Sequence, residues 1–337
     1  MMTETWPTFA MVEEAAARIR DVTSHTPMVP SFGLSRLSNA DVRLKLESTQ
    51  PTRAFKVRGA ANVILASGEI DPGLGVVTYS TGNHGRAVTY VAGRMGLKAT
   101  VCMSHNTTAD KQKALRQMGA DVRIVGQSQD EAAELALELQ ADGYLLIDPI
   151  NDPLTTAGQG TIGLELVEQW ADVDTVVVPV SGGALMAGIA LAVKSLRPGA
   201  RLVGVSMDRG AAMYESLQAG EPTAVPEVES LADSLQGGIG LDNDHSFAMV
   251  RDLVDDLILV NEEQIAVAMA EAVIEERVIL EGAGATPIAA VLYADRALFG
   301  QNVALVASGA MVDIGVLMKL VDDHAGEVAN LFDGAAS

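Results

Sequence analysis

Short apolar runs alternate along the chain with longer segments in which apolar residues recur at helical spacing. The strand-like runs lie at residues 42–46, 75–79, 99–103, 122–125, 175–180, 202–206, 257–260 and 303–306. The clearest helical segments lie at residues 83–95, 108–118, 129–139, 184–196, 262–276 and 286–298. Several of these begin after a Ser, Thr, Asp or Asn cap and end at glycine. Strands that alternate with helices predict βαβ units and largely parallel sheets that are covered on both faces.

This alternation divides the chain into two parts. Residues 60–142 form a compact run of three or four strand–helix units, and the remaining strands belong to a second, larger sheet. A chain of 337 residues also exceeds what a single core usually spans. We therefore predict an α/β fold with two open, twisted, mostly parallel sheets and helices on both faces. Residues 53–144 are predicted to form a small domain, inserted into a large domain of residues 1–52 and 145–337.

Composition and charge narrow the classes of function. The 23 Lys and Arg residues against 44 Asp and Glu residues give a formal net charge of -21, which argues against nucleic acid or an anionic membrane as a partner. The first residues lack the pattern of a signal peptide, and no stretch approaches the roughly 18 apolar residues of a membrane helix. The sequence therefore predicts a cytoplasmic protein. Its single cysteine, Cys102, lies in an apolar run and is expected to be a buried hydrophobe.

Two loops that follow strands carry unusual sequences, and in such sheets ligands bind at the carboxyl ends of the strands. The first loop, after the strand at 75–79, is Ser80-Thr81-Gly82-Asn83-His84-Gly85-Arg86. Backbone N–H groups are unpaired where a helix begins, and they suit a carboxylate or a phosphate. A plain capping turn is the alternative, but capping requires only one such polar residue. We expect this loop to bind an anionic group.

The second loop follows the strand at 175–180 and leads into a long apolar helix. It consists of Ser181, Gly182, Gly183, Ala184 and Leu185. Small residues let the backbone approach an anion closely, and the N-terminus of the helix adds partial positive charge. The pattern predicts a phosphate-binding loop, with a tight strand-to-helix turn as the alternative. It is not a P-loop, because the Gly-Lys-Ser/Thr ending is missing.

Two other kinds of site find little support. Residues 158–163 match G-x-G-x-x-G, but they follow a turn and the start of a helix instead of a strand. A nicotinamide dehydrogenase is therefore a poor alternative, and these glycines are expected to allow close helix packing. No histidine is paired at ligand spacing with another His or Cys, so no metal site is predicted. The histidines are His25, His84, His105, His245 and His324.

Lys56 lies between Phe55 and Val57, in a stretch whose apolar residues suggest burial. Burial lowers the pKa of a lysine, and the neutral amine is a nucleophile toward carbonyl groups. The alternative is a lysine with a covered stem and a solvated head group. The chain also has a predicted phosphate-binding loop and no other evident nucleophile, which favours Schiff-base chemistry. A phosphate-bearing aldehyde cofactor, pyridoxal 5′-phosphate, would satisfy both features.

Four motifs, in this order, make the chain resemble a known family. They are Gln50-Pro51-Thr52 through Phe55-Lys56-Val57-Arg58-Gly59-Ala60, then residues 80–85, then residues 181–185, then Ser308-Gly309. Over about residues 18–316 the chain resembles the fold-type II pyridoxal-phosphate enzymes, whose fold is like that of the tryptophan synthase β-subunit. The nearest branch contains threonine/serine dehydratases and serine racemase. The stretches 80–87, 206–213 and 232–243 also resemble the dehydratase of hydroxyectoine utilisation.

The resemblance implies a role for each motif. Lys56 would bind the cofactor covalently and move the substrate α-proton, Phe55 would pack beside the ring, and Asn83 would hydrogen-bond the 3′-oxygen. Ser308 would face the pyridine nitrogen, and Thr81 stands where serine racemase has its second acid/base. The phosphate would be held by backbone N–H groups of Ser181, Gly182, Gly183, Ala184 and Leu185. The substrate carboxylate would be received by Ser80, Thr81, Gly82, Asn83 and His84.

The same resemblance implies an ammonia-lyase that eliminates water and then ammonia from a β-hydroxy amino acid, in the degradation of hydroxyectoine. The alternative is an amino-acid racemase of the serine or aspartate type with the same cofactor, using Lys56 and Thr81 on opposite faces. A small amino-acid substrate and a homodimer are expected. Arg53-Ala54 replaces the family's usual Gly-Ser, and Arg86 replaces its usual Gln. These departures weaken the case for simple serine or threonine as the substrate.

Overall fold

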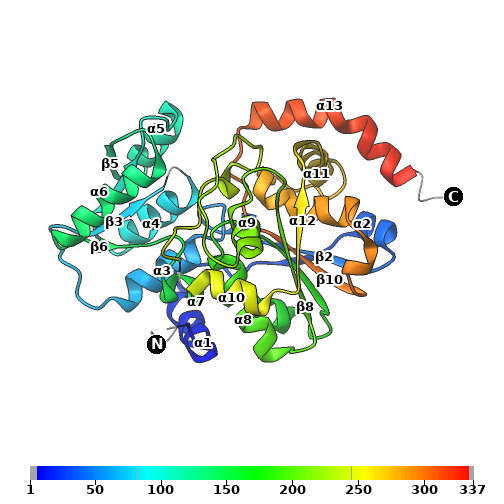
Figure 1. Cartoon of the computed structure of the whole chain (residues 1–337), viewed down its shortest axis with the longest axis horizontal. Coiled ribbons are helices and arrows are strands. Elements are labelled where there is room, and N and C mark those ends of the chain that lie inside the picture. The colour runs from blue at the N-terminus through cyan, green and yellow to red at the C-terminus, as the bar shows by residue number, and fades with distance from the viewer. Residues whose placement is uncertain (1–5, 81, 244, 334–337) are drawn as a thin grey trace.

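The computed structural model describes residues 6–80, 82–243 and 245–333, which fold around two sheets (Figure 1). Within these residues the larger sheet has six strands, of which β1 alone runs antiparallel to its neighbour. In spatial order they are β1 (Met28–Pro30), β2 (Asp41–Leu46), β10 (Asn302–Ala307), β7 (Thr175–Pro179), β8 (Arg201–Met207) and β9 (Asp256–Val260). The smaller sheet is parallel throughout its described strands. In spatial order these are β5 (Asp121–Ile124), β4 (Ala99–Met103), β3 (Val76–Tyr79) and β6 (Leu145–Leu146).

Helices connect the strands and form the outer layers. They are α1 (Phe9–Ile19), α2 (Phe32–Ser38), α3 (Val57–Ala66), α4 (Asn83–Arg94), α5 (Ala109–Gln117), α6 (Gln129–Ala141), α7 (Pro153–Gln169), α8 (Ala184–Leu196), α9 (Ala212–Ala219), α10 (His245–Leu253), α11 (Glu262–Ile274), α12 (Gly282–Tyr293) and α13 (Ile314–Asp333). Short 3₁₀ turns are η1 (Glu47–Thr49), η2 (Asp233–Leu235) and η3 (Arg296–Leu298). Over the described part of the chain, none of these helices combines the length and apolar character that crossing a membrane requires.

Alternate residues of each strand face opposite layers of helices. In β7, Val176 and Val178 pack with the core formed by α7 and α8, whereas Val177 packs with the core formed by α11 and α12. In β3, Val76 packs with α3 and α4, and Val77 packs with α6. This alternation follows from the two-residue period of a strand. The predicted fold of two mostly parallel sheets with helices on both faces is confirmed, and the single cysteine is buried as expected.

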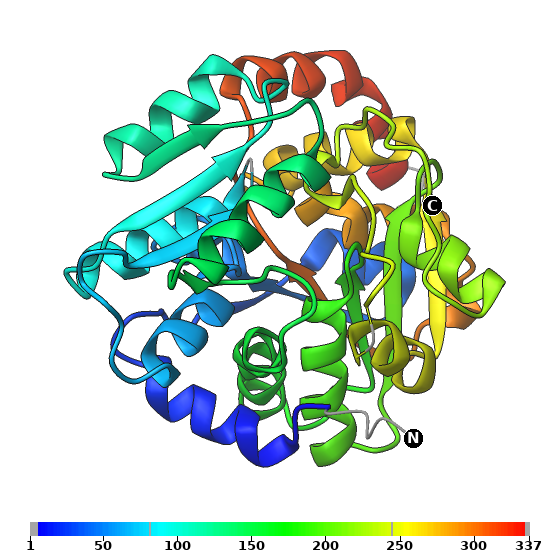
Figure 2. The same ribbon diagram turned by 60° about the vertical axis from the view of Figure 1, so that its left-hand side comes forward.

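Helix α7 packs against α3 on one side and α8 on the other. Its glycines lie inside the helix and serve close packing, as the sequence predicts. A Cβ at Gly158 would lie 2.7 Å from the Cα of Gly59 on α3, and a Cβ at Gly188 on α8 would lie 2.3 Å from the carbonyl oxygen of Thr156. Only glycine permits such approaches. In Figure 2, α1 (dark blue) runs along the outside of α7 and α8 (green).

A group of buried charges joins the first turn of α3 to the large sheet and to α7. The side chain of Arg58 is 1% exposed, and its guanidinium pairs with Glu47 of η1 at 2.8 Å and with Glu165 of α7 at 2.6 Å. Lys45 of β2 pairs with the same Glu165 at 2.5 Å. Two cations and two carboxylates therefore offset one another where water has little access. The backbone on either side of Arg58, including Lys56, is held by these contacts.

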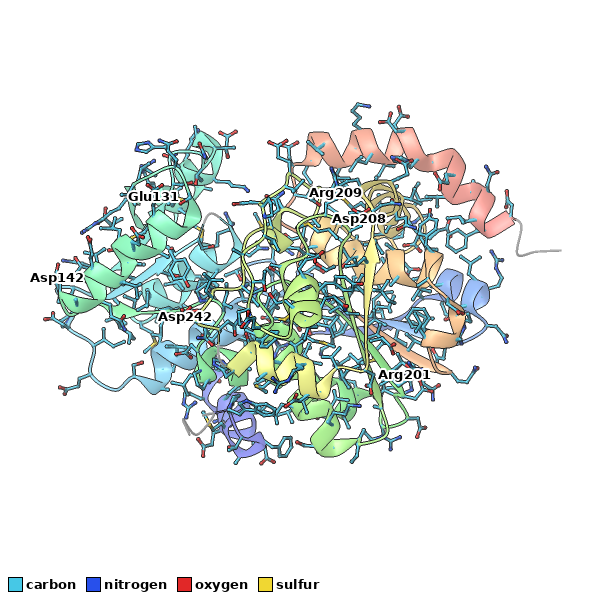
Figure 3. The ribbon with its side chains drawn as sticks, viewed as in Figure 1. Glu131, Asp142, Arg201, Asp208, Arg209 and Asp242 are labelled. Atoms are coloured by element: carbon cyan, nitrogen blue, oxygen red, sulfur yellow. The ribbon has the colours of Figure 1, made fainter. Side chains whose placement is uncertain are left out.

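The excess of acidic residues lies on the surface. Exposed carboxylates such as Glu131, Asp142 and Asp208 are spread over both parts of the molecule (Figure 3). Some of them pair with neighbouring guanidinium groups, as Asp208 does with Arg209 at 3.8 Å. Pairs of this kind are solvated and contribute little to the free energy of folding. The buried group around Arg58 is different, because the side chains of Lys45, Glu47 and Arg58 are at most 1% exposed.

We expect the Arg58→Ala variant to lose about 3–5 kcal/mol of unfolding free energy, because Glu47 and Glu165 would keep buried charges without their partner. The matched control is Arg123→Ala, which removes an exposed pair with Asp121 at 3.2 Å. That change should cost less than about 1 kcal/mol. Urea unfolding followed by circular dichroism measures both, and equal losses in the two variants would contradict the importance of the buried group.

Candidate active site

Lys56 directly follows a short segment that pairs with the residues after β10. Ala54 and Gly309 form an isolated antiparallel bridge. Next to it, the backbone N–H of Phe55 donates to the carbonyl oxygen of Ser308 at 3.0 Å. Lys56 then occupies the N-cap position of α3, where its side chain makes no capping hydrogen bond. This pairing brings together two residues far apart in the sequence, Lys56 and Ser308, that are both predicted to belong to the cofactor site.

The amine of Lys56 lies in a confined, mixed environment. Its side chain is half-buried, and Nζ donates to the carbonyl oxygen of Pro149 at 3.4 Å. Nζ also lies 5.2 Å from the centre of the Phe55 ring. Burial lowers the pKa of Lys56 to about 8, while the nearby carboxylates of Asp148 and Glu281 oppose this effect. A substantial fraction of the amine is therefore neutral near physiological pH, as a nucleophile or a proton acceptor requires.

His84, in the first turn of α4, faces the same region in its neutral form. It is 2% exposed, and its Nε2 lies 3.0 Å from the carbonyl oxygen of Ile147. Because a carbonyl oxygen only accepts, Nε2 carries the proton and Nδ1 is an acceptor. Nδ1 has no partner among the described residues. Burial, reinforced by the charge of Lys56, lowers the pKa of His84 to about 3.

Glu281, just before α12, completes the polar lining, and the sequence analysis did not identify it. Asn83 Nδ2 donates to its two carboxylate oxygens at 2.8 and 3.0 Å, and the backbone N–H of Met311 donates at 2.9 Å. Ser234 of η2 adds a bond of 3.2 Å. Burial raises the pKa of Glu281 to about 7, although the Asn83 bond opposes this. The only signal in the sequence is a carboxylate between apolar Leu280 and the small residues that follow.

The predicted phosphate loop forms a tight entry into α8. Gly183 is the N-cap, with a φ of 99°, and no side chain caps the helix. This positive φ is one that glycine adopts without strain, and a Cβ at this position would also meet Met213 Cε at 2.7 Å. The carbonyl oxygen of Gly182 accepts from Ser246 Oγ at 2.8 Å, which fixes the loop. The first N–H groups of α8, beginning at Ala184, have no partner within the helix and suit an anion.

The remaining predicted residues have varied surroundings. Ser80 Oγ accepts from the backbone N–H of Gly82 at 3.3 Å. Ser308 is 2% exposed. Arg86 is half-buried on α4, and its Nε has no partner among the described residues. Thr81, predicted to contact the substrate and to act as an acid/base, lies outside the described residues.

The roles predicted for the phosphate-binding loop and for Asn83 stay predictions. Ser181 and Gly182 are half-buried, and Ala184 and Leu185 are buried at the start of α8. Asn83 is predicted to bind the cofactor's 3′-oxygen, yet its amide donor is directed at Glu281 here.

The arrangement fits pyridoxal phosphate. It contains a lysine whose amine is neutral in part, an uncapped helix N-terminus at a glycine turn, and a hydroxyl residue beside the lysine segment. Two buried polar atoms in the same region, Asn83 Oδ1 and His84 Nδ1, have no partner in the described part of the chain. Buried polar groups are normally hydrogen-bonded, so these atoms are free to bind a ligand.

We expect the Asp148→Asn variant to take up pyridoxal phosphate with a pH dependence shifted to lower pH. In the wild type, the rate of uptake by the apoenzyme should rise with a midpoint near pH 8, the pKa of Lys56. Asp148 raises that pKa, so its neutral replacement should lower the midpoint by about one pH unit. Asp142→Asn, on the exposed end of α6, is the control. Unchanged midpoints in both variants would show that Asp148 does not act on this amine.

Comparison with known proteins agrees with this geometry. The family model described as "Pyridoxal-phosphate dependent enzyme" matches residues 19–309. A protein of Sinorhizobium fredii named "Putative threonine dehydratase" is 48% identical, over 92% of this chain and 94% of its own, and the "L-threonine ammonia-lyase" of Thermotoga maritima is 37% identical, over 92% and 77%. The structure of maize serine racemase is 32% identical with a TM-score of 0.86, and the match covers 95% of this chain and 98% of the racemase. The chain therefore belongs to the pyridoxal-phosphate dependent enzymes, the family and cofactor that its motifs predict.

Proposed function

We propose that this pyridoxal-phosphate dependent lyase removes water and then ammonia from a β-hydroxy amino acid. The observation that carries the proposal is the environment of the Lys56 amine. Burial lowers its pKa to about 8, and the carboxylates of Asp148 and Glu281 lie near enough to act on it. An amine of this kind can attack a carbonyl group and can also accept a proton at neutral pH. The names of the two relatives, a threonine dehydratase and a threonine ammonia-lyase, support this reaction class.

When bound, the cofactor supplies an electron sink for the electron pair left at the substrate α-carbon. Lys56 accepts the α-proton, and the unpaired N–H groups at the start of α4 receive the substrate carboxylate. Glu281, with a pKa of about 7, retains a proton in part of the molecules at neutral pH and is held in place by Asn83. Loss of the β-hydroxyl with a proton gives water, and hydrolysis of the released enamine gives an oxo acid and ammonia.

We propose further that the substrate comes from the degradation of hydroxyectoine. Three stretches of the sequence resemble the dehydratase of that process, and one of them, residues 232–243, contacts the candidate site. Ser234 donates to Glu281 at 3.2 Å, and Asn243 Nδ2 donates to the carbonyl oxygen of Gly182 at 3.2 Å. A segment with these contacts can distinguish substrates. The departures from the family pattern at Arg53 and Arg86 support a substrate other than simple threonine.

An amino-acid racemase with the same cofactor is the second candidate. The likeness to maize serine racemase favours it, because the match covers nearly the full length of both chains. Racemisation would need a second acid/base opposite Lys56, the role predicted for Thr81. The two functions share α-proton removal and differ in whether the β-hydroxyl is lost.

We also propose a domain division, an oligomeric state and a cellular location for this enzyme. Residues 53–144 form a small domain inserted into the large one, a division supported by three strands of the smaller sheet, β3, β4 and β5, whereas the fourth, β6, follows directly after residue 144. The resemblance to the family further supports a homodimer in the cytoplasm. Analytical ultracentrifugation of the holoenzyme would show a monomer if the dimer is wrong.

We expect the holoenzyme to form an oxo acid and ammonia from at least one member of a panel of β-hydroxy amino acids. The panel contains threonine, serine, hydroxyaspartate and 3-hydroxy-2,4-diaminobutyrate derivatives. Lys56→Ala should lower the rate at least about a thousandfold, since proton transfer and cofactor attachment are both lost. Lys319→Ala, which changes an exposed lysine of α13, should leave the rate unchanged.

Three results would contradict parts of the proposal. Chiral chromatography that finds only inverted amino acid, without oxo acid, would support the racemase instead. Turnover of threonine far above every hydroxyectoine-related compound would contradict the proposed substrate. Full activity in Lys56→Ala would contradict the assigned site.

A further inference from the structure

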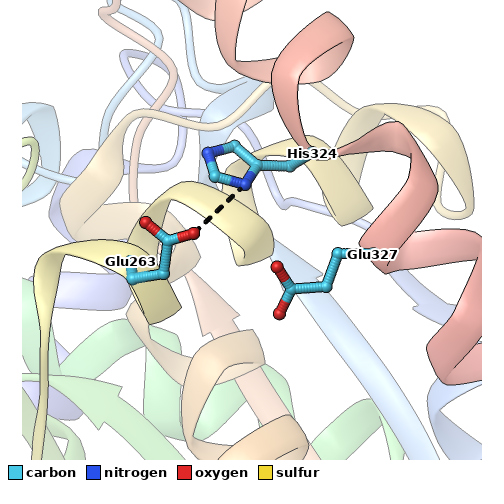
Figure 4. Close-up of side chains that lie close together, drawn as sticks. All are labelled: Glu263, His324 and Glu327. Carbon is cyan, nitrogen blue, oxygen red and sulfur yellow. Dashed lines mark ion pairs between the residues drawn. The ribbon is translucent and has the colours of Figure 1, made fainter.

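Three side chains with metal-binding atoms lie together on a surface formed by α11 and α13. They are Glu263 of α11 and His324 and Glu327 of α13, and Figure 4 shows them facing one another between the two helices. Each offers one ligand atom, and these atoms all lie within 4.8 Å of one another. None of the three residues belongs to the candidate active site described above.

The distances are close to those of a coordination sphere. His324 Nδ1 lies 3.5 Å from Glu263 Oε1. For Zn²⁺, ligand bonds of about 2.0–2.1 Å in a tetrahedral site place neighbouring ligand atoms about 3.4 Å apart. The pair is therefore already at the separation that a shared zinc ion would impose. The Glu327 carboxylate must approach by about 1.4 Å at most, which is within the reach of an exposed glutamate side chain.

Two features hold the ligands in position. His324 and Glu327 are three residues apart on one helix, so they lie on the same face of α13. Tyr293, at the end of α12, donates its hydroxyl to Glu327 Oε1 at 3.0 Å and leaves the other oxygen available. Hydrogen bonds of this kind orient metal ligands. The imidazole of His324 is also restrained, because its side chain is only 14% exposed.

The local charge favours a cation. Among the described residues, neither Glu263 nor Glu327 pairs with a lysine or arginine, and Lys319 on the same helix pairs with Asp323 instead. Two carboxylates thus face one imidazole without a permanent positive charge between them. Glu263 is 70% exposed, so water can fill the fourth position. Imidazole with carboxylates suits Zn²⁺ and its neighbours in the transition series, whereas Mg²⁺ and Ca²⁺ prefer sets of oxygen ligands.

We propose that Glu263, His324 and Glu327 bind one Zn²⁺ ion, which fastens the C-terminal helix α13 to α11. Helix α13 already packs against α11 and the large core through its buried residues Leu317, Val328 and Phe332. A metal that joins the two helices would add a link on their solvent side. The sequence predicts no metal site, because the ligands of this one include a carboxylate from another helix, and ligand spacing along the chain gives no sign of it.

Isothermal titration calorimetry of the holoenzyme, freed of metal by chelation and desalted, tests the proposal with zinc chloride as the probe. We expect about one equivalent of Zn²⁺ to bind the wild type. His324→Asn and Glu327→Gln should weaken binding at least tenfold, and Tyr293→Phe by about 10- to 100-fold. The matched control is His25→Asn, because His25 also faces a carboxylate, Glu168, at 3.6 Å, but no third candidate ligand joins them among the described residues.

Thermal unfolding supplies a second measurement, because an ion that binds the folded state raises the midpoint temperature of unfolding. Zn²⁺ should raise the midpoint of the wild type and of His25→Asn, and leave that of His324→Asn unchanged. The proposal is overturned if the wild type binds no Zn²⁺, or if His324→Asn and Glu327→Gln bind it as tightly as the wild type does. Equal weakening by His25→Asn would also overturn it, since binding would then reflect the general negative charge of the surface.

Discussion

The position of the reactive amine depends on the buried guanidinium of Arg58. Its two carboxylate partners come from η1, which follows β2, and from the middle of α7, so one side chain ties α3 to both. Removing charges from water is costly, and it is offset here only because every member of the group has a partner. Lys56 lies two residues before Arg58, at the N-cap of α3. The charge group thus fixes the backbone from which the amine projects.

Burial has a second consequence, because it favours the neutral form of each titratable group near that amine. It lowers the pKa of Lys56 and of His84 and raises that of Glu281. The three effects have one physical cause, the loss of water around a charge. A site with a neutral imidazole, a partly neutral amine and a partly protonated carboxyl group can accept and release protons near pH 7. The charges that act on this amine in the described part of the chain are the carboxylates of Asp148 and Glu281.

Much of this arrangement could be predicted from local sequence. The strand at 99–103 and the start of α8 at residue 184 agree with the pattern, because apolar runs and glycine turns are local signals. The predicted helix at 286–298 is wrong at both ends, since α12 spans Gly282–Tyr293 and contains Pro287. Proline leaves the carbonyl oxygen of Ala283 without its helical donor, and the hydroxyl of Thr286 donates to it instead at 2.9 Å. Because this hydroxyl replaces the missing N–H donor, the helix continues through a proline that in the sequence suggests a boundary.

Other features could not be predicted, because they join residues that are distant in the chain. Arg58 and Glu165 are 107 positions apart, and Asn83 and Glu281 are 198 positions apart. Hydrophobic periodicity gives no information on such pairs. The role of Glu281 depends on partners from three separate segments, so its sequence neighbours alone resemble an ordinary helix start.

The segment around η2 connects α5 to the titratable groups near the amine. Lys111 on α5 pairs with Asp233 at 3.0 Å, which links the part of the chain around the smaller sheet to η2. Both side chains are 44% exposed, so the pair adds little to stability. Asp233, however, raises the pKa of Glu281, and Glu281 in turn raises that of Lys56. Asp233 therefore connects α5, through its pair with Lys111, to the carboxyl group whose charge acts on the amine. This segment also carries Ser234, so changes in its sequence alter both the shape of the site and the protonation of its groups.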